Sequence, residues 1–516
     1  MGIAIRESIK SSIASYLGVL IGSINIVLLY TRFLSTEQLG LTRVLQDTTL
    51  LFVSLAQLGS PFIIIKFFPH FQNKENNNNG FLFFSIIYSI IGFLIFTFIF
   101  LLFHKTLAGI YLSKSPLIVD YLYYIIPYVF GFILLNIFEA YIIVNSKVFY
   151  PTFIREVFIK LSNTLLIILL GFYIIDFSQF ILLLILAHFI ASFLLLVYIK
   201  RFDNFSLRPD FSIFKSDKFK NILNYGFFTV LGGIGYVLAT KIDIIMLAAY
   251  KGLKQTAIYT IAIFIATLME IPKKSLNKSV TSALSFAIKN DDKDIIETLY
   301  KKTSINLFIF GSILFIVLWT NINDLFLIMP RGEIYQAGKI VLFIFLTGRL
   351  LDLLSGINSE IILYSKYYRY TILFTLLLGL LTIATNIIFI PIYGILGAAI
   401  ATFLSLFVFI IARIIFVWIK FQMHPFNLNT LKIILIFLVF FFISLQLNSP
   451  FSNFVHNYLS GFNHIIVSII LICIKSLLLV SLFVTIVIKF NISQDFSNLI
   501  SVSILKLKNV FKSNKI

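Results

Sequence analysis

Long apolar stretches separated by short polar segments fill almost the whole chain. Each stretch is about 20 residues long, the length that an α-helix needs to cross a hydrocarbon core of about 30 Å. The stretches are apolar on all faces and do not alternate every second residue, so they predict spanning helices and exclude a barrel. Fourteen can be counted, near residues 13–34, 44–67, 81–103, 121–144, 153–175, 179–199, 225–249, 256–282, 304–327, 338–364, 370–390, 396–420, 431–447 and 463–489.

The first six stretches recur as stretches seven to twelve, about 218 residues later. Residues 142–147 (IIVNSK) match 361–366 (IILYSK), and residues 197–200 (VYIK) match 417–420 (VWIK). A third, weaker match joins the residues that follow the first and the seventh stretch. Three matches in order at nearly one offset favour a duplication. Because each repeat holds an even number of helices, the halves should be related by a pseudo-twofold axis along the membrane normal.

The pattern therefore predicts an all-α membrane protein of about 14 transmembrane helices, arranged as two six-helix lobes plus two C-terminal helices. The expected division is an N-terminal lobe at 1–200, a cytoplasmic linker at 201–224, a C-terminal lobe at 225–420, and two additional helices with a basic cytoplasmic tail at 421–516. A duplicated membrane bundle is typical of transporters, whose substrate site lies between the repeats.

Composition and charge support this interpretation. A mean hydropathy of +1.00 and 12% charged residues exclude an ordinary soluble domain. With the N-terminus inside, 28 of the 41 Lys and Arg residues lie in cytoplasmic loops and adjoining helix ends, against 7 on the outside. This asymmetry predicts a multi-pass protein with both termini in the cytoplasm. The dispersed basic residues favour contact with anionic membrane lipids and argue against nucleic-acid binding.

The sequence lacks the motifs of several enzyme and metal-site classes. The single cysteine, Cys473, lies in an apolar stretch and the six histidines are scattered, so neither a disulfide framework nor a zinc site is predicted. No Walker loop occurs, so the chain should not hydrolyse ATP by itself. We expect neither catalytic residues nor a bound cofactor.

Residues 390–402 read IPIYGILGAAIAT, with a proline that should end one helix, a glycine that should make the turn and small residues that should let the next helix pack closely. This segment resembles the signature of polysaccharide flippases, the Wzx-like branch of the multidrug/oligosaccharidyl-lipid/polysaccharide exporter superfamily. Residues 241–243 with 257–262, and residues 31–40, are also similar to that family. The resemblance covers essentially the whole chain, including the count of fourteen helices.

The resemblance implies a bacterial inner-membrane flippase that acts by alternating access. Such a protein moves undecaprenyl-diphosphate-linked oligosaccharide repeat units from the cytoplasmic to the periplasmic leaflet. It would serve a pathway for lipopolysaccharide O-antigen, capsule or exopolysaccharide, with a polysaccharide polymerase and chain-length machinery as protein partners. Its cleft should offer cations for the diphosphate and a lateral gap for the polyprenyl tail.

Ionisable side chains inside the stretches are the best site candidates, because each is costly in lipid and normally faces protein or water. Lys241 and Asp243 lie in the seventh stretch and, two residues apart, point about 200° away from each other. The near-cytoplasmic lysines of the second and eighth stretches could meet a diphosphate, although snorkelling anchors explain them equally well. The expected substrate-binding residues are Lys241, Lys66, Lys273, Lys274, Arg349 and Gln57.

Other charged pairs have a simpler explanation. Glu156 and Lys160 are spaced i, i+4 and Arg349 and Asp352 are spaced i, i+3, so both predict pairs within one helix. Three glycines at positions 232, 233 and 235 of the seventh stretch predict either a bend between transport states or close helix packing.

The resemblance also suggests an ion-coupling site. In related lipid II flippases a sodium site lies among helices seven, eleven and twelve, and the matching polar residues here are Asp243, Asn386 and Thr402. Only Asp243 is acidic, so the resemblance leaves Na⁺ and H⁺ both open as coupling ions.

Three alternatives stay open at this point. A cation-coupled multidrug exporter is disfavoured because the first stretch carries no carboxylate. A lipid II flippase has closer chemistry, but the 390–402 segment fits the polysaccharide branch better. A non-transporting scaffold for polysaccharide synthesis would tolerate the removal of charges throughout the cleft.

Overall fold

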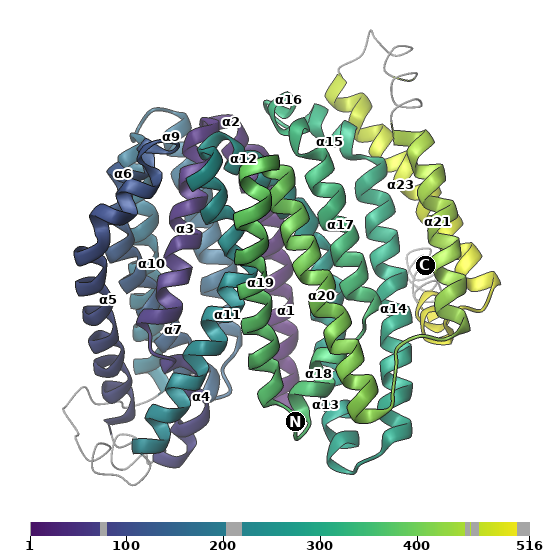
Figure 1. The fold of residues 1–516 in the computed structure, drawn as a ribbon, viewed down its shortest axis with the longest axis horizontal. Helices are drawn as coiled ribbons and strands as arrows, with labels where there is room; N and C mark the ends of the chain where they lie inside the picture. The colour runs from purple at the N-terminus through teal and green to yellow at the C-terminus, as the bar shows by residue number, and fades with distance from the viewer. Residues whose placement is uncertain (1, 73–79, 203–218, 449–454, 456–463, 503–516) are drawn as a thin grey trace, which may run out of the picture. The chain divides into compact units, whose positions relative to one another are not determined.

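The computed structural model describes residues 2–72, 80–202, 219–448, 455 and 464–502. Every regular element among them is a helix, which confirms the all-α prediction (Figure 1). The α-helices are α1 Gly2–Ser23, α2 Thr31–Phe33, α3 Thr36–Ala56, α4 Ser60–Phe71, α5 Phe81–Leu112, α6 Pro116–Tyr121, α7 Ile125–Val144, α8 Phe149–Phe153, α9 Ile159–Gly171, α10 Phe177–Phe202, α11 Phe219–Lys251, α12 Leu253–Thr267, α13 Ile271–Lys289, α14 Lys293–Thr320, α15 Ile322–Ile328, α16 Gly332–Tyr335, α17 Lys339–Leu354, α18 Asn358–Tyr364, α19 Arg369–Tyr393, α20 Ile395–Phe421, α21 Leu428–Asn448 and α23 His464–Lys489. The π and 3₁₀ segments are η1 Ile24–Tyr30, η3 Leu122–Tyr124, η4 Ile154–Phe158, η6 Leu268–Glu270 and η7 Gln336–Gly338.

Within the described residues, 11 helices are long and apolar enough to cross a membrane, or up to 13 if each of two bent pairs is one span. The bent pairs are Thr36–Ala56 with Ser60–Phe71, at 41°, and Gly332–Leu354 with Asn358–Tyr364, at 51°. The fifth predicted stretch corresponds to α8, η4 and α9, where a π-helical segment interrupts an otherwise continuous helix. The count of fourteen therefore stays a prediction.

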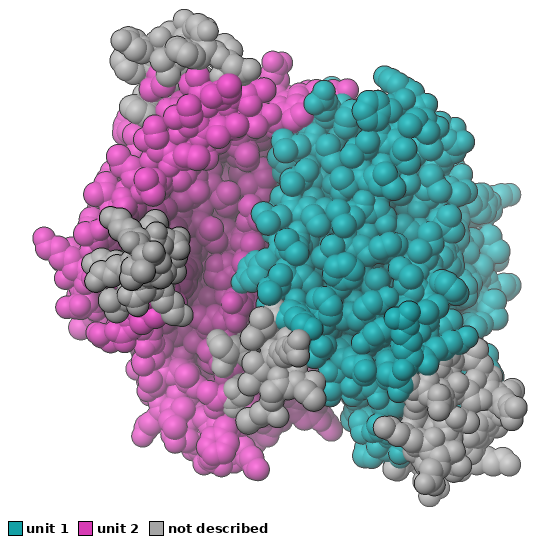
Figure 2. Space-filling view, turned by 180° about the vertical axis from the view of Figure 1, so that it is seen from behind, with its two compact units in different colours: residues 1–261, 375–402 teal, residues 262–374, 403–516 magenta. Residues whose placement is uncertain are grey.

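Contacts divide the chain into two compact units, coloured separately in Figure 2. Unit 1 comprises Met1–Ile261 and Thr375–Thr402, and unit 2 comprises Ala262–Phe374 and Phe403–Ile516. The units do not coincide with the halves of the sequence repeat, because α11 and most of α19 belong to the same unit as the first six predicted stretches. Most of the predicted linker lies outside the described residues. The lobe boundaries and the pseudo-twofold axis stay predictions.

In unit 1, α3 packs against α7 and α11. Its start is set by a capping box: the Ser35 hydroxyl accepts a bond from the Gln38 amide at 3.1 Å, and the Gln38 side chain accepts one from the Ser35 amide at 2.9 Å. Such a cap stabilises a helix by about 1 kcal/mol. Gly40 then allows the first turn to approach the Leu253 carbonyl so closely that a Cβ would clash with it. These local features fix where α3 begins and let it approach the start of α12 closely.

The second predicted stretch is broken where α3 passes into α4. Leu58 and Gly59 both adopt left-handed backbone angles, with φ of 49° and 76°. A side chain at position 59 would meet Thr229 and the backbone of Gly226 on α11, so glycine suits this position both for its conformation and for its size. The eighth stretch is also interrupted, by the short 3₁₀ segment η6 between α12 and α13. The second helix of each sequence repeat is thus bent or interrupted next to candidate site residues.

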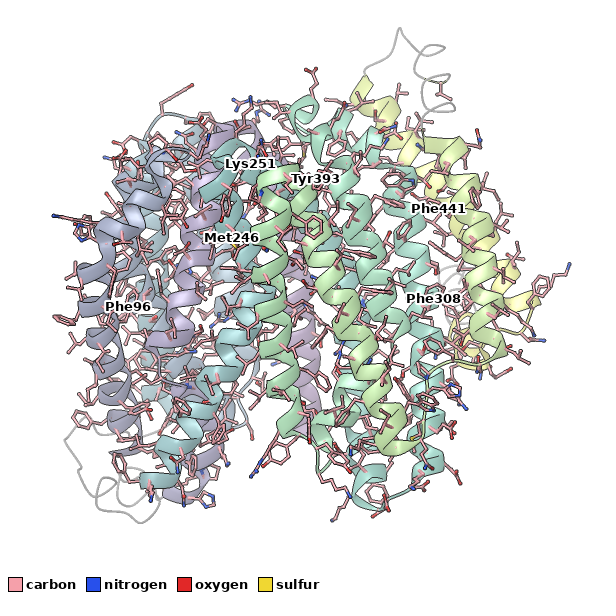
Figure 3. The ribbon with its side chains drawn as sticks, in the orientation of Figure 1. Phe96, Met246, Lys251, Phe308, Tyr393 and Phe441 are labelled. Atoms are coloured by element: carbon pink, nitrogen blue, oxygen red, sulfur yellow. The ribbon has the colours of Figure 1, made fainter. Side chains whose placement is uncertain are left out.

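The segment at 390–402 has the turn at Gly394 that its sequence predicts, but the prediction that Pro391 ends the helix is wrong. Gly394 separates α19 from α20 with a φ of +60°, while α19 itself continues two residues beyond Pro391. Gly397 lies against the Phe389 carbonyl, where a Cβ would clash. The Lys251 ammonium donates to the Pro391 carbonyl at 2.8 Å, which joins the end of α11 to the end of α19 (Figure 3).

Unit 2 has its own apolar core, in which α14 packs against α13, α17, α21 and α23. Aromatic rings fill part of it: Phe315 makes edge-to-face contacts with Phe437 and Phe441, and Phe308 also meets Phe437 (Figure 3). A buried ion pair between Asp324 of α15 and Lys475 of α23 ties the last described transmembrane helix to this core. The C-terminal helices are therefore an integral part of unit 2.

Candidate functional site

Lys241 lies in a cluster of three charged side chains between α3 and α11. Its ammonium is 3.5 Å from the Asp47 carboxylate, and the Arg43 guanidinium is 2.8 Å from the other oxygen of the same carboxylate. The Asp47 side chain is 1% exposed, whereas Lys241 and Arg43 are 26% and 24% exposed. One buried carboxylate thus holds two half-buried cations, and the cluster carries a net positive charge.

Sequence reasoning missed Arg43 and Asp47. The signal that could have found them is an aspartate inside an apolar stretch with an arginine one helical turn before it. Lys241 was singled out for the same reason, but its partner on another helix could not be identified from spacing. The cluster places one cation of α3 beside the cation predicted on α11.

Asp243 belongs to a separate hydrogen-bonded group on another face of α11. Its carboxylate accepts a bond from the Tyr259 hydroxyl at 2.6 Å, a longer one from the Thr402 hydroxyl at 3.4 Å, and one from the Ile244 amide at 2.8 Å. Tyr259 is fully buried and Asp243 is 4% exposed. The predicted divergence of Lys241 and Asp243 is therefore confirmed, because the two side chains have different partners on different helices.

Asn386, the third expected ion-coupling residue, lies on α19. Its side chain is fully buried, and neither its oxygen nor its nitrogen makes a hydrogen bond within the described part of the chain. Gly235 packs against Leu376, and Leu238 packs against Gly379, so α11 and α19 run parallel in register. That register places Asn386 about 3 Å further along the helix axis than Asp243, at 1.5 Å per residue.

These oxygen atoms fit a monovalent cation better than a divalent one. Asp243 supplies the only carboxylate of the group, and hydroxyl and amide oxygens of Thr402 and Asn386 are neutral ligands of the kind that hard cations accept. No group of three or more His, Cys, Asp or Glu side chains that could hold a metal ion occurs among the residues that the structure describes. The Asn386 amide is buried without a hydrogen-bond partner among the described residues, which is a costly arrangement.

Gln57 lies at the break between α3 and α4 and joins a polar network with α7. Its side-chain oxygen accepts a bond from the Asn136 amide at 3.0 Å, and the Asn136 oxygen accepts one from Arg155 at 2.6 Å. Arg155 also forms an ion pair with Glu139. This network pairs Glu139 of α7 with Arg155 of η4.

Unit 2 contains a larger charged network around Glu270 and Asp352. Lys273 donates to Asp352 at 2.6 Å, and Arg413 approaches the other carboxylate oxygen at 3.2 Å. Glu270 is 2.9 Å from Arg349 and 3.1 Å from Lys274. The expected substrate-binding residues Lys273, Lys274 and Arg349 are therefore brought together, each paired with a carboxylate.

The predicted pair of Arg349 with Asp352 within one helix is wrong. Arg349 instead reaches Glu270, and Asp352 takes its cations from α13 and α20. The reason is that η6 and α13 present charged groups to this face of α17, so each side chain finds an opposite charge on a neighbouring helix. By contrast, the predicted pair of Glu156 and Lys160 is confirmed at 2.7 Å.

Lys66 on α4 lies with its ammonium over an aromatic ring. Its ammonium is 3.8 Å from the centre of the Tyr225 ring on α11 and 5.5 Å from that of Phe67. The side chain is exposed. A cation held over a ring in this way keeps its charge available to an anion.

A family model described as polysaccharide biosynthesis protein matches residues 5–285, just over half of the chain. Among solved structures, the fold is similar to the lipid II flippase MurJ in an inward closed conformation, with a TM-score of 0.68 and 15% identity over 93% of this chain and 100% of that chain.

Multidrug transporters share the fold as well. An inward-facing multidrug resistance MATE family transporter of the MOP superfamily matches with a TM-score of 0.63 and 15% identity, over 81% of this chain and 98% of that chain. An outward-facing one matches with a TM-score of 0.54 and 17% identity, over 81% and 95%. None of the curated proteins matches the sequence. At such identities the similarities show the fold, which this chain shares with that flippase and these transporters.

Proposed function

Because the chain belongs to the polysaccharide biosynthesis protein family, we propose that it is a flippase for undecaprenyl-diphosphate-linked oligosaccharide repeat units. It would carry these lipids from the cytoplasmic to the periplasmic leaflet of a bacterial inner membrane. The protein has the fold of membrane transporters and flippases, not of an enzyme family. The sugar pathway, whether O-antigen, capsule or exopolysaccharide, follows from the substrate's glycan and is left to experiment.

The observation that carries the proposal is the positively charged cluster of Lys241, Arg43 and Asp47. A diphosphate that leaves the headgroup region must be neutralised, because bare charge is expensive in hydrocarbon. The cluster offers two cations and one carboxylate, so it can attract an anion without leaving Asp47 unpaired. Lysine suits a moving phosphate, since its ammonium is a point charge on a flexible stem.

The unit 2 network supports alternating access. Its cations, Lys273, Lys274 and Arg349, are held by Glu270 and Asp352 across three helix segments. An arriving diphosphate would compete with these carboxylates for the same cations. Substrate binding can in this way weaken contacts that hold η6 and α13 against α17, and so shift the population of transport states.

We propose further that transport is coupled to Na⁺ through Asp243, Asn386 and Thr402. The support is the buried, unpartnered amide of Asn386 in register with an aspartate. Bound Na⁺ would neutralise Asp243 and be coordinated by the Asn386 side-chain oxygen. Coupling to H⁺ is the other possibility, in which protonation of Asp243 does the same without a metal.

A lipid II flippase is the second candidate, favoured by the similarity to MurJ over the whole of that chain. Reconstitution in vesicles separates the two. The vesicles should contain either a fluorescent undecaprenyl-diphosphate-linked oligosaccharide or fluorescent lipid II, and membrane-impermeant quencher added outside reports which lipid crosses. Selective movement of the oligosaccharide lipid supports the proposal, whereas selective movement of lipid II refutes it. Movement of neither, with folded protein, favours the scaffold.

A further inference from the structure

The two clearest matches between the sequence repeats meet in space in unit 2. Residues 361–366 end in Lys366 and residues 417–420 end in Lys420. The ammonium of Lys366 lies 5.4 Å from the centre of the Tyr367 ring, and that of Lys420 lies 5.8 Å from the same centre. One ring therefore holds two ammonium groups that come from segments distant in the sequence.

The position of this ring is fixed by its own turn and by α20. The Ser365 hydroxyl accepts a bond from the Tyr367 amide at 3.1 Å, and the Ser365 carbonyl accepts one from the Tyr368 amide at 3.2 Å. These bonds close the turn between α18 and α19. The Tyr367 ring then packs edge to face against Phe416 and Phe421, at centroid distances of 5.8 and 5.7 Å. The two lysines are thus gathered at a built ring cluster.

The positive charge of this cluster is not neutralised by the protein. Lys366, Lys420 and Arg369, the first residue of α19, are exposed, and none pairs with a carboxylate in the part of the chain that the structure describes. In the interior of the same unit, by contrast, each cation of the Glu270 and Asp352 network has a carboxylate partner. Ammonium groups held at one ring repel each other, and a bound anion removes that repulsion. A phosphate supplies the charge and the acceptor oxygens that lysine and arginine recognise.

The place of the cluster along the helices favours a phosphate that belongs to a lipid. The cluster lies at the start of α19 and the end of α20, two helices that are long and apolar enough to cross a membrane. The charge pattern predicts that this end faces the cytoplasm. Leu373, which is 55% exposed, follows Arg369 by four residues and so lies one turn further into the span on the same face. Basic sites between transmembrane helices at the cytoplasmic surface are suited to anionic headgroups.

Unit 1 contains a related cluster that carries less positive charge. Lys147 is the counterpart of Lys366 in the repeat, and its ammonium lies 4.6 Å from the centre of the Phe202 ring and 5.9 Å from that of Tyr198. A carboxylate is present here, because Glu7 of α1 accepts a bond from a backbone amide of α8 at 3.0 Å. The arrangement of lysine and rings therefore occurs in both repeats, but in unit 2 it lacks such a carboxylate.

We infer that the unit 2 cluster of Lys366, Tyr367, Arg369 and Lys420 binds the phosphate headgroup of an anionic phospholipid of the cytoplasmic leaflet. This phospholipid is a bound membrane lipid and not the transported molecule, so the inference does not depend on the proposed substrate. The unit 1 cluster, with its carboxylate, should bind such a lipid more weakly.

Native mass spectrometry of the detergent-purified protein tests the inference. The protein is mixed with phosphatidylglycerol or with phosphatidylethanolamine at equal concentration, and the lipid that stays bound is counted. We expect several-fold more phosphatidylglycerol than phosphatidylethanolamine on the native protein, and a several-fold loss of this preference when Lys366→Gln and Lys420→Gln are combined. The matched control combines Lys432→Gln and Lys489→Gln, two exposed lysines at the same predicted side, and should keep the preference. Equal loss in both double variants, or no preference in the native protein, would overturn the site.

Variants of the ring provide a second readout. Tyr367→Leu removes the ring that gathers the two ammonium groups and should lower the preference, whereas Tyr367→Phe should keep it; equal behaviour of these two variants would contradict the role of the ring. Competition separates the sources of phosphate. Inorganic phosphate that displaces phosphatidylglycerol at equal concentration would replace the lipid site by a site for soluble anions. Undecaprenyl diphosphate that displaces it at lower concentration than phosphatidylglycerol itself would make the cluster a site for the transported lipid and overturn the inference.

Discussion

Replacing Lys241 with alanine should slow transport strongly while leaving the protein folded. In the structure, Lys241 is the more weakly held of the two cations on Asp47, at 3.5 Å against 2.8 Å for Arg43. Its removal therefore leaves the buried carboxylate with its nearer partner. The cluster loses the cation that is free enough to follow a phosphate.

The magnitudes separate the two effects. Two unit charges at this distance attract by about 5 kcal/mol at an effective dielectric constant of 20, but desolvation and side-chain entropy offset most of that for a partly exposed pair. We expect a loss of stability of about 1 kcal/mol or less. A charge-assisted hydrogen bond to the diphosphate contributes about 1.5–3 kcal/mol, so losing it in the transition state slows flipping about 10- to 150-fold.

Two measurements on the same preparations check these values. Thermal unfolding of the detergent-solubilised protein reports stability, and quencher accessibility of the labelled oligosaccharide lipid in vesicles reports the flipping rate. Lys241→Arg should retain part of the rate, and Lys254→Ala, which removes an exposed lysine from α12, should retain all of it. If Lys241→Ala flips normally while Asp243→Ala does not, Lys241 is only an anchor and the ion-coupling role of Asp243 gains support.

Four further outcomes are expected. Replacing Na⁺ with choline should slow flipping by the native protein but not the residual flipping of Asp243→Asn; unchanged flipping in choline at constant pH would leave H⁺ as the coupling ion. Gly235→Ala should slow transport more than Gly233→Ala. A Cβ at 235 would lie 3.0 Å from the Leu376 amide nitrogen, whereas a Cβ at 233 would lie 3.9 Å from the Ser54 Cβ. Equal transport rates of the two variants would contradict this packing argument. Asp352→Asn leaves Lys273 and Arg413 without their shared carboxylate and should destabilise the fold by about 3–5 kcal/mol, measured as a lower unfolding temperature. The control Asp495→Asn removes a carboxylate from an exposed ion pair and should leave the unfolding temperature unchanged. Reporter fusions after Lys200 and Lys302 should report cytoplasm and one near Asn453, outside the described residues, periplasm; a cytoplasmic signal there would break the count of fourteen.

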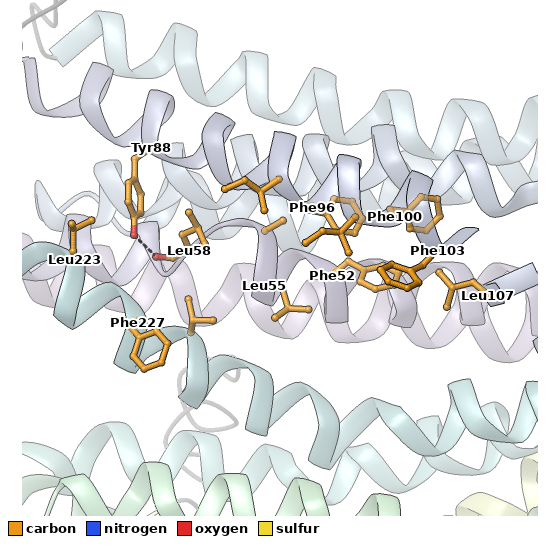
Figure 4. Close-up of a pocket in the computed structure, with 15 residues that line it drawn as sticks. Phe52, Leu55, Leu58, Tyr88, Phe96, Phe100, Phe103, Leu107, Leu223 and Phe227 are labelled. Carbon is orange, nitrogen blue, oxygen red and sulfur yellow. Dashed lines mark hydrogen bonds between the residues drawn. The ribbon is translucent and has the colours of Figure 1, made fainter. Parts of the chain in front are cut away.

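The break in the second stretch shows how far local pattern reaches. The apolar pattern predicts one span at 44–67, whereas the structure breaks it at Gly59, between α3 and α4. The direction in which the neighbouring side chains turn is not encoded locally. Gln57 faces Asn136, and Leu58 lines an apolar cavity beside α5 (Figure 4), only because α5 and α7 pack on different sides of the break.

The sequence by itself determined that the chain is a bundle of membrane helices with the 390–402 turn between two of them, since apolar length, turn glycines and small residues act through local physics. It also identified Lys241 and Asp243 as buried charges with separate surroundings. Only the tertiary structure decided their partners: Asp47 from α3 for the lysine, Tyr259 from α12 and Thr402 from α20 for the aspartate. The physical reason is that a buried charge pairs with whichever opposite charge or hydroxyl a packed helix brings within reach. That choice depends on the rotation and register of helices distant in sequence. Arg349, for example, pairs with Glu270 of η6 and not with Asp352 on its own helix.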